Sequence, residues 1–534
     1  MQDFDVIIIG GGVVGTGVAR DCAMRGLRTI LLEKKDFCAG TSGTCSGMVH
    51  GGPRYLKYDV DTTYLSCLDS GYIQKIAPHL IFRIPFIIPV FKDHPYGIEK
   101  VETFFTIYDK FQPLKGGLKH GRLTREEALK LEPMISPDIT GAVTMDEWGI
   151  DVFRLCILNA LSAENHKAVI RNYIEVTDFI KEGNKIKGVK ITDKISGKKD
   201  RITASIVLNA AGPWVPEICK MADTEVKMRP AKGVHLILDR RISNIGIILT
   251  AIDGRDIFVL PHENTTLIGC TDDDYFGDLD NVKTIHDEVE YLLTSAEYVI
   301  PSIREARIIR CMAGVRNTLY TYGILEDNLS REFEIFDHEQ RDNVPGFITI
   351  AGGKMAMYRY MSEKVTDLIC EKLGNTEKCK THVEYLSGSQ DIPDAIQLAE
   401  EYNMPVYTIK RLIFRHGAKA LDILAPVKEL PFLKSHICTC EPVTEAEIRY
   451  CIRNEMVVTL DDLRRRTRLG TGPCQGMNCT WKAAAIMGEE LNWPLYKIHK
   501  EIMAFLKERW KGKMPILTGE QLRQEELNQA IYAS

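Results

Sequence analysis

The sequence predicts an α/β protein with three parts: a mainly parallel sheet covered by helices, a second domain built on an antiparallel sheet, and a small helical module near the C-terminus. Three observations indicate this fold class. A β-branched run at residues 5–9 leads through a glycine-rich turn and a helical segment to a second strand-like run at residues 28–33. Residues 220–330 contain several short strand-like stretches, and residues 438–479 hold two close pairs of cysteines.

The turn after the first strand has the spacing G-x-G-x-x-G, formed by Gly10, Gly12 and Gly15. These glycines permit a tight turn, a close approach of the backbone to a pyrophosphate, and close packing of the helix on the strand. Glu33 lies 18 residues after Gly15, where an acidic side chain accepts hydrogen bonds from an adenosine ribose. Because strand, turn, helix, strand and acid follow in this order, the segment predicts a dinucleotide site rather than an ordinary glycine-rich turn.

Composition excludes several classes of protein. The 534 residues are 45% hydrophobic and 26% charged, which is ordinary for a globular protein with a large core. The net charge of -5 argues against nucleic-acid binding, and Met1 leads almost directly into the first strand, so we expect no signal peptide. The longest apolar stretch, residues 80–91, is too short and too broken by Arg83, Pro85 and Pro89 to span a bilayer. This stretch predicts a strand and turn, with a membrane-touching surface as the alternative. We therefore expect a cytoplasmic protein.

Local patterns predict the remaining elements. Residues 60–80 favour a helix, and Thr124 begins a short capped helix. Two alternating strands around residues 182–184 indicate a hairpin. Residues 390–430 favour helices, and the tail at residues 491–534 favours a polar helix.

Three later segments suit a bound cofactor. The loop at residues 38–55 is rich in Gly, Ser and Thr, whose amides and hydroxyls can surround a cofactor, and the strand-like run at residues 205–209 ends in small residues that permit close approach. Residues 347–354 predict a strand, a double glycine and a second helix start, where Lys354 would stabilise negative charge on a reduced flavin. An ordinary strand–helix corner is the alternative there. The cofactor-binding candidates are Gly10, Gly12, Gly15, Glu33, Thr41, Ser42, Ser46, Gly47, Val176, Ala211, Gly212, Gly352, Gly353 and Lys354.

The four clustered cysteines are Cys438, Cys440, Cys474 and Cys479. A cytosolic compartment disfavours disulfides, so two close thiol pairs predict a tetrathiolate metal site. The spacings C-x-C and C-x4-C are atypical of zinc and favour an iron–sulfur cluster, with zinc or no metal as alternatives. Four arginines just before the second pair predict charge compensation for the cluster, a docking surface for a partner, or a solvated helix face: Arg464, Arg465, Arg466 and Arg468.

Together these motifs closely resemble the FAD-dependent glycerol-3-phosphate dehydrogenase family, in the form with a C-terminal bacterioferritin-associated-ferredoxin-like (BFD-like) domain. The resemblance covers essentially the whole chain and rests on stretches such as "DVIIIGGGVVGTGVARDCAMRGL", "VHGGPRYL", "LIGCTD", "AGVRNTL", "GFITIAGGKMAMYR" and "DLRRRTRLGTGPCQGMNC". It implies an FAD-binding domain of the glutathione-reductase/DAO type, an antiparallel-sheet substrate domain, and a helical domain with a 2Fe-2S cluster.

The expected domain limits follow from this resemblance and the local patterns. They are 1–95, 145–220 and 331–375 for a discontinuous FAD-binding domain, 96–144 and 221–330 for the substrate domain, 376–430 for a helical connector, 431–490 for the BFD-like domain, and 491–534 for the tail.

The resemblance implies oxidation of sn-glycerol 3-phosphate at C2 to dihydroxyacetone phosphate, with hydride transfer to the flavin. His50 has a suitable intrinsic pKa for the base that takes the hydroxyl proton. Arg54 can bind the phosphate bidentately or orient the hydroxyls of the substrate, and Tyr55 can donate a hydrogen bond to the phosphate. Arg316 and Arg331 resemble further substrate arginines. For each residue, a structural ion pair or a core histidine is the alternative.

The resemblance also implies partners. Such chains work with a second, flavin-containing subunit together with an iron–sulfur, membrane-anchoring subunit, so that electrons pass through the cluster to quinone at the cytoplasmic face of the membrane. Three other functions stay open: an oxidase that returns electrons to O2, another FAD-linked 2-hydroxy-acid or amine dehydrogenase with the same appended module, and a non-catalytic electron-relay subunit.

Overall fold

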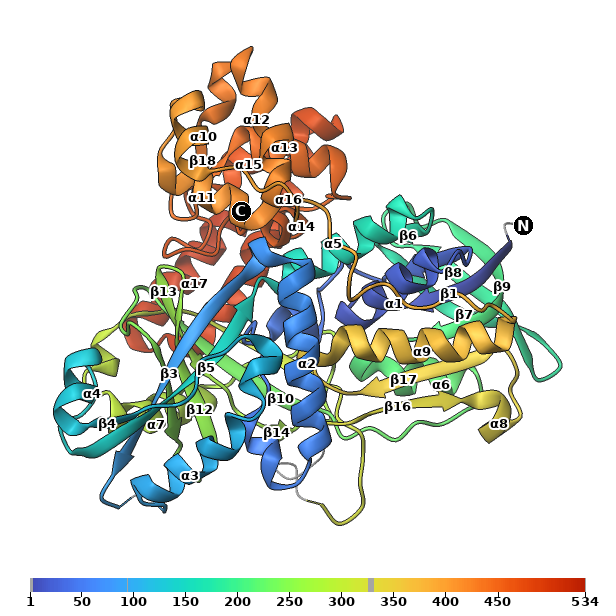
Figure 1. The fold of residues 1–534 in the computed structure, drawn as a ribbon. Helices are drawn as coiled ribbons and strands as arrows, with labels where there is room; N and C mark the ends of the chain where they lie inside the picture. The colour runs from blue at the N-terminus through green and yellow to red at the C-terminus, as the bar shows by residue number, and fades with distance from the viewer. Residues whose placement is uncertain (1–2, 94, 325–330, 534) are drawn as a thin grey trace.

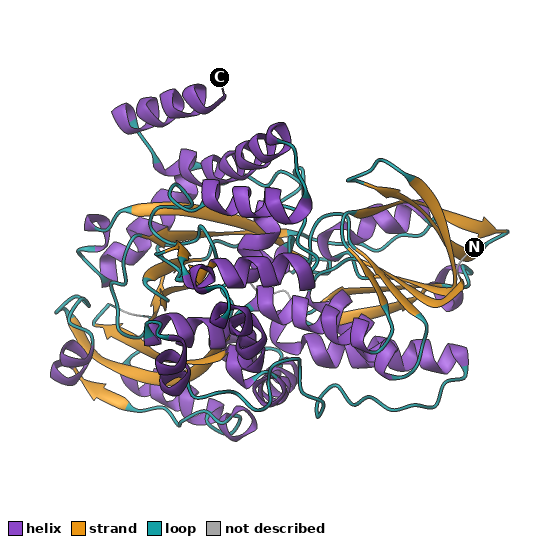
Figure 2. Cartoon of the chain, turned by 90° about the horizontal axis from the view of Figure 1, so that it is seen from above, coloured by secondary structure: helices purple, strands orange, loops and turns teal. Residues whose placement is uncertain are grey.

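The computed structural model describes residues 3–93, 95–324 and 331–533, so the expected domain limits at residues 1, 330 and 534 lie outside the described part of the chain. Most of its strands form two large sheets on opposite sides of the molecule, with helices between them (Figure 2). A third sheet has two short strands, β18 (His436–Cys438) and β19 (Val443–Thr444). The C-terminal helices lie above the junction of the two sheets (Figure 1). The predicted fold class is confirmed.

The first sheet is the Rossmann-like part of the fold. Its strands lie in the order β16-β17-β9-β1-β2-β6 and run parallel, except for β16. Their bounds are β1 (Asp3–Ile9), β2 (Thr29–Leu32), β6 (Val169–Arg171), β9 (Lys199–Asn209), β16 (Phe333–Asp337) and β17 (Phe347–Gly352). The expected hairpin is formed by β7 (Ile174–Glu182) and β8 (Lys185–Asp193), and β8 pairs with β9.

Side chains of β1 alternate between two cores. The helices that cover this sheet include α1 (Val13–Met24), α5 (Val152–Asn165), α6 (Val215–Met221) and α9 (Tyr358–Leu373). Val6 and Ile8 pack in a core with α1, α5 and α9, whereas Ile7 and Ile9 pack in a core with the hairpin and α6. Burial on both faces is what a short β-branched run predicts for a central parallel strand.

The second sheet has the order β14-β10-β13-β12-β11-β3-β5-β4, with β15 also paired to β10. Neighbouring strands are antiparallel, except that β11 runs parallel to β3. The bounds are β3 (Ile81–Phe91), β4 (Arg122–Thr124), β5 (Ile139–Ile150), β10 (Ala231–Leu238), β11 (Gly246–Thr250), β12 (Asp256–His262), β13 (Thr265–Gly269), β14 (Asp273–Asp274) and β15 (Ile308–Arg316). The predicted antiparallel sheet within residues 220–330 is therefore confirmed.

One expected domain limit separates a strand from its own sheet. Residues 81–91, placed with the FAD-binding domain by the limit at residue 95, form β3 of the second sheet and pair along their whole length with β5. The limit between residues 144 and 145 also divides β5. Pairing between strands so far apart in the sequence is set by tertiary contacts rather than local pattern, so local periodicity could not assign it. Within the described residues, none of the helices combines the length and apolar character that crossing a bilayer requires.

The C-terminal part is helical, as predicted. The connector contains α10 (Ala395–Tyr402), α11 (Val406–His416) and α12 (Ala420–Leu424); the module contains α13 (Glu445–Asn454), α14 (Leu460–Thr467) and α15 (Thr480–Leu491); the tail contains α16 (Leu495–Lys513) and α17 (Gly519–Ala533). The module and α16 share a hydrophobic core. Two capping boxes fix helix starts, one at Thr459 and one at Thr124, where the sequence predicted a capped helix.

The arginine run of α14 attaches the module to the first sheet. Arg466 is buried and donates to both carboxylate oxygens of Asp36 at 2.8 Å, and Arg465 lies 3.1 Å from the same carboxylate. Burial raises the pKa of Asp36, but the guanidinium groups outweigh it and hold this pKa below its usual range. The interpretation as a solvated helix face therefore needs correction for Arg465 and Arg466, because these side chains bind within the chain instead of facing solvent.

Replacing Arg466 by Ala is expected to destabilise the fold by about 3 kcal/mol, because it leaves the Asp36 carboxylate buried and only partly paired. The measurement is urea unfolding followed by tryptophan fluorescence, since Trp481, Trp493 and Trp510 lie in the C-terminal part. Arg523→Ala is the matched control, because Arg523 pairs with Glu520 at the surface, where both side chains are over 70% exposed. Equal effects of the two substitutions would contradict a docking role for Arg466.

Candidate functional site

A cavity of about 830 Å³ lies between the two sheets. One wall is formed by the ends of β1, β2 and β17, where the glycine-rich turn and the second double glycine lie; the other is formed by β3, β12 and β15 of the second sheet. Parallel strands direct their carboxyl ends to one edge of the sheet, and ligands of open α/β folds bind there.

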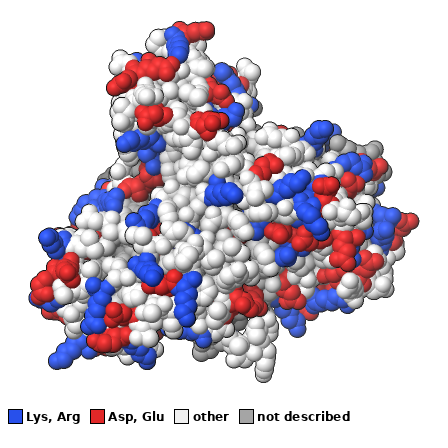
Figure 3. Space-filling model, viewed as in Figure 1, with Lys and Arg blue, Asp and Glu red and all other residues white. Residues whose placement is uncertain are grey.

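Basic and acidic groups mix on the face shown in Figure 3, without a broad basic surface.

The glycine-rich turn has the geometry expected of a dinucleotide site. Gly10 has φ +110°, and a Cβ added at Gly15 would lie 1.9 Å from the carbonyl oxygen of Gly10, so close packing requires glycine at both positions. The hydroxyl of Ser42 accepts from the first amide of α1, that of Val13, at 3.1 Å. A pyrophosphate at this helix N-terminus would meet backbone amides and the positive end of the helix dipole.

Glu33 hydrogen-bonds to the same turn. Its carboxylate accepts from the amide of Gly11 at 2.6 Å and from the amide of Lys35 at 2.7 Å, and it lines the cavity. Burial raises its pKa. Each carboxylate oxygen can accept a further hydrogen bond, so the position suits a ribose hydroxyl.

Most predicted cofactor residues line this cavity; Gly15 and Gly47 do not. Gly15 has the packing role expected of it. Gly47 has φ +68° and is not among the lining residues, so its contact with the cofactor stays a prediction. Ser46 lines the cavity and hydrogen-bonds to His235 at 2.9 Å. The wall therefore offers amides, hydroxyls and small residues along its length, which fits a bound FAD.

His50 and Lys354 meet at one end of the cavity. The ammonium group of Lys354 donates to the backbone oxygen of His50 at 3.0 Å and lies 4.9 Å from the centre of the Tyr55 ring. Burial, together with the charges of Lys354, Lys115 and Arg54, lowers the pKa of His50 well below its usual range. The imidazole is therefore neutral at physiological pH and able to accept a proton.

Three arginines line the same end. Arg54 stacks 5.1 Å from the Tyr55 ring, whereas Arg316 and Arg331 both approach the carboxylate of Asp272. Burial lowers the pKa of Arg331. With Lys354, four cationic side chains lie in this region, and Asp272 pairs with two of them, Arg316 and Arg331, so the region attracts an anion such as a phosphate ester. The structure thus brings all five predicted catalytic residues together.

Three further residues of this region have no role predicted from the sequence: Asp272, Cys270 and His235. Cys270 accepts from Arg316 at 2.9 Å, and although burial raises its pKa, Arg316 and His235 lower it to about 6. The stretch "LIGCTD" was available as part of the family resemblance, but a thiol and an acid so close together at a strand end carry no signal of their own.

The pH dependence of substrate turnover is expected to show a flat range below pH 8 and a single alkaline limb above it. Because the pKa of His50 lies well below 6.5, the base stays neutral and the rate should hold constant from pH 8 down to pH 6.5. Burial raises the pKa of Tyr55, but Arg54, Lys354 and Arg331 outweigh it and lower this pKa to about 8. Above pH 8 the phenolate should repel a phosphate, so KM rises, and Tyr55→Phe should remove this alkaline limb in steady-state assays across pH. An alkaline limb that persists in Tyr55→Phe would contradict the assignment.

The sulfurs of the four module cysteines lie in a row, each near the next. The sulfur of Cys440 lies 3.9 Å from that of Cys474, and the thiol of Cys479 interacts with both Cys474 and Cys438. In the described part of the chain, no three of these sulfurs lie within 4.8 Å of one another. A Cβ added at Gly472 would lie 2.4 Å from the Cβ of Cys440, so glycine is needed there.

Backbone amides point at these sulfurs. Those of Gly470 and Glu441 face Cys438, and those of Gly476 and Asn478 face Cys474. The Cys479 thiol and these amides lower the pKa of Cys474 to about 5. Amides aimed at sulfur stabilise thiolates and cluster sulfides.

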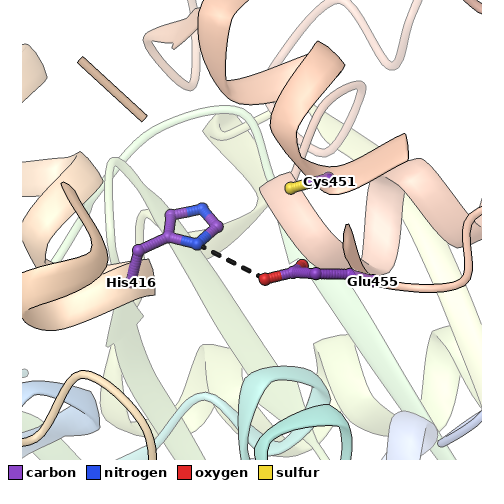
Figure 4. Close-up of side chains that lie close together, drawn as sticks. All are labelled: His416, Cys451 and Glu455. Atoms are coloured by element: carbon purple, nitrogen blue, oxygen red, sulfur yellow. Dashed lines mark ion pairs between the residues drawn. The ribbon is translucent and has the colours of Figure 1, made fainter. Parts of the chain in front are cut away.

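A second group of metal-ligand types lies nearby: His416, Cys451 and Glu455 (Figure 4). Their partners are already supplied by the protein, because Arg154 donates to both oxygens of Glu455 at 2.6 and 3.0 Å, and His416 contacts Glu447 at 3.0 Å. The group is therefore a buried ion-pair network between α5, α11 and α13, and the cysteine row is the stronger metal candidate.

A dinucleotide turn, a second glycine–lysine turn and a cavity covered by an antiparallel sheet define an FAD-dependent oxidoreductase. Residues 5–358 match the family described as "FAD dependent oxidoreductase", and residues 379–497 match "C-terminal domain of alpha-glycerophosphate oxidase". The chain is 35% identical to the A-type subunit of anaerobic glycerol-3-phosphate dehydrogenase from Escherichia coli K12, over 99% of this chain and 96% of that protein. It is 34% identical to the A-type subunit from Haemophilus influenzae, over 99% and 92%.

The chain belongs to the FAD-dependent oxidoreductases, within the family of A-type subunits of anaerobic glycerol-3-phosphate dehydrogenase. Its fold is similar to that of the glycerol-3-phosphate dehydrogenase from Bacillus halodurans complexed with FAD, with a TM-score of 0.78, 26% identity and 97% of each chain covered. The predicted FAD dependence is confirmed.

Proposed function

We propose that this enzyme oxidises sn-glycerol 3-phosphate to dihydroxyacetone phosphate and passes the electrons through a 2Fe-2S cluster to partner subunits and quinone. The observation that carries the proposal is the grouping of Arg54, Arg316, Arg331 and Lys354 around neutral His50 at one end of the dinucleotide cavity. The names of the similar proteins agree with this substrate.

The residues divide the chemistry between them. The arginines bind the phosphate, and Arg54 is oriented by its stacking on Tyr55. His50 accepts the proton of the C2 hydroxyl, and its lowered pKa means that the imidazole is unprotonated before that step. Bound FAD would supply the hydride acceptor, held by the glycine-rich turn, Glu33 and Lys354.

Cys438, Cys440, Cys474 and Cys479 would hold the 2Fe-2S cluster. A single tetrahedral zinc with bonds of about 2.3 Å brings its four sulfurs to within about 3.8 Å of each other. The row of sulfurs is more extended than that, which supports a binuclear site over the zinc alternative. A 2Fe-2S cluster can carry electrons one at a time from FAD to partners.

The partners proposed are a second, flavin-containing subunit together with an iron–sulfur, membrane-anchoring subunit, which would place the enzyme peripherally at the cytoplasmic face of the membrane. The similar proteins are each named as one lettered component of their dehydrogenase, which supports a multi-subunit complex.

An oxidase that returns electrons to O2 is the second candidate, because residues 379–497 match a domain named for alpha-glycerophosphate oxidase. One hydrogen peroxide formed per substrate oxidised would support it. The cysteine row favours the dehydrogenase, because an oxidase passes electrons from the flavin to O2 and does not need a cluster that carries them one at a time to a partner.

The deciding experiment is an anaerobic absorption spectrum of the purified enzyme before and after sn-glycerol 3-phosphate, with glycerol and lactate as control substrates. Bleaching of the flavin band by the phosphate ester alone is expected. Equal bleaching by lactate would favour a 2-hydroxy-acid dehydrogenase, and no bleaching by any of them would favour a relay subunit.

A further inference from the structure

Asp272 lies between two of the cavity arginines. One carboxylate oxygen is 2.6 Å from Arg316, and the other is 3.3 Å from Arg331. The carboxylate therefore joins two guanidinium groups from different parts of the fold, one at the end of β15 and one just before β16. It lines the cavity and is itself only 6% exposed.

The segment that carries Asp272 is firmly held. The hydroxyl of Thr271 accepts from the amide of Val234 at 3.0 Å, and Arg255 donates to the backbone oxygen of Asp272 at 2.5 Å. Arg316 also donates to the Cys270 sulfur and to the Thr271 carbonyl, at 2.9 and 3.0 Å. Three consecutive residues thus fix one guanidinium group in place.

Arg331 also contacts Asp272. It donates to the hydroxyl of Thr318 at 2.7 Å, and among the described residues Asp272 is the carboxylate that pairs with its buried side chain. Like charges repel in a buried setting, so without the carboxylate the two guanidinium groups would move apart. An arginine in a new direction cannot make a bidentate contact with the same phosphate.

We propose that Asp272 is a positioning residue that aims Arg316 and Arg331 at the phosphate of the substrate. This inference rests on the proposed function, because it takes a phosphate ester as the ligand. Asp272 does not touch the reacting carbon, so its loss should weaken substrate binding and leave the chemical step nearly unchanged.

Two possible roles of Asp272 predict opposite changes in phosphate affinity when its charge is removed. Asp272→Asn keeps the shape of the side chain but makes the cavity more positive. If Asp272 only tempered the charge, phosphate would bind more tightly in this variant. If Asp272 aims the arginines, KM for sn-glycerol 3-phosphate should rise about tenfold or more while kcat stays within about threefold, since small misplacements of binding groups carry large costs.

Two variants complete the design. Asp273→Asn removes the same charge one residue away, from a side chain that is 53% exposed and outside the cavity lining, so KM should not change. Asp272→Glu keeps the charge and should restore part of the affinity. If Asp272→Asn fails to retain flavin, Asp272→Glu decides: a KM raised about threefold supports positioning, since the longer side chain shifts both arginines slightly, and an unchanged KM overturns it.

Inorganic phosphate provides a second readout, independent of turnover. Titration followed by the flavin absorbance should give weaker binding in Asp272→Asn than in the wild type. Tighter or equal binding, or a loss confined to kcat, would overturn the proposal. If the wild type is not reduced by sn-glycerol 3-phosphate at all, the proposed function fails, and the phosphate titration still tests the role of Asp272.

Discussion

Flavin reduction by sn-glycerol 3-phosphate should slow by about 10³-fold in His50→Asn, because removing a positioned general base costs this much and asparagine cannot take up the proton. FAD should remain bound. The contact between Lys354 and residue 50 uses the backbone oxygen, which the substitution keeps, so the lysine stays in place. Anaerobic stopped-flow absorbance measures the reduction rate, and the flavin-to-protein ratio measures cofactor content.

His79→Asn is the matched control for this prediction. His79 is also buried, its ring interacts with Ser389, and it lies outside the cavity lining. We expect normal reduction in that variant. An unchanged reduction rate in His50→Asn would show that another group is the base, whereas loss of FAD from this variant would show that His50 supports the cofactor.

The parts of this site that sequence could predict are those written in short local patterns. The turn at Gly10, Gly12 and Gly15 is required by backbone geometry, and its glycines exclude most alternatives wherever they occur with this spacing. The double glycine before Lys354 is similar, since Gly352 and Gly353 both have positive φ. Such constraints act over a few residues, so they survive without knowledge of the fold.

What sequence could not predict depends on partners far along the chain. The arginines of α14 looked like a solvated or docking face, but Arg466 is buried against Asp36, 430 residues away in sequence. Asp272 acquires its role only because the end of β15 and the residues just before β16 bring two arginines to it. A charged side chain looks the same in sequence whether it faces water or a buried counter-ion, so its pattern carries no information about the partner.

The cysteine row permits the other prediction of large effect. Cys474→Ser should remove the iron–sulfur absorbance and the iron itself, because a serine hydroxyl replaces one of four thiolate ligands. Electron transfer from substrate to an external one-electron acceptor should fall at least tenfold, while anaerobic flavin reduction by substrate stays near its wild-type rate. Among the described residues, none of the four module cysteines lines the cavity. Flavin reduction by the substrate, which takes place in the cavity, should therefore not depend directly on Cys474.

Cys451→Ala separates this site from the competing metal candidate. Cys451 belongs to the same module and to the group with His416 and Glu455, but it has no place in the cysteine row. We expect full iron content in Cys451→Ala, measured per flavin by a colorimetric iron assay, and almost none in Cys474→Ser. The reverse pattern would move the metal to the His416 group. Joint loss of iron and flavin reduction in Cys474→Ser would instead show that the cluster holds the fold together, because the module packs on the loop of Asp36 directly beside the dinucleotide turn.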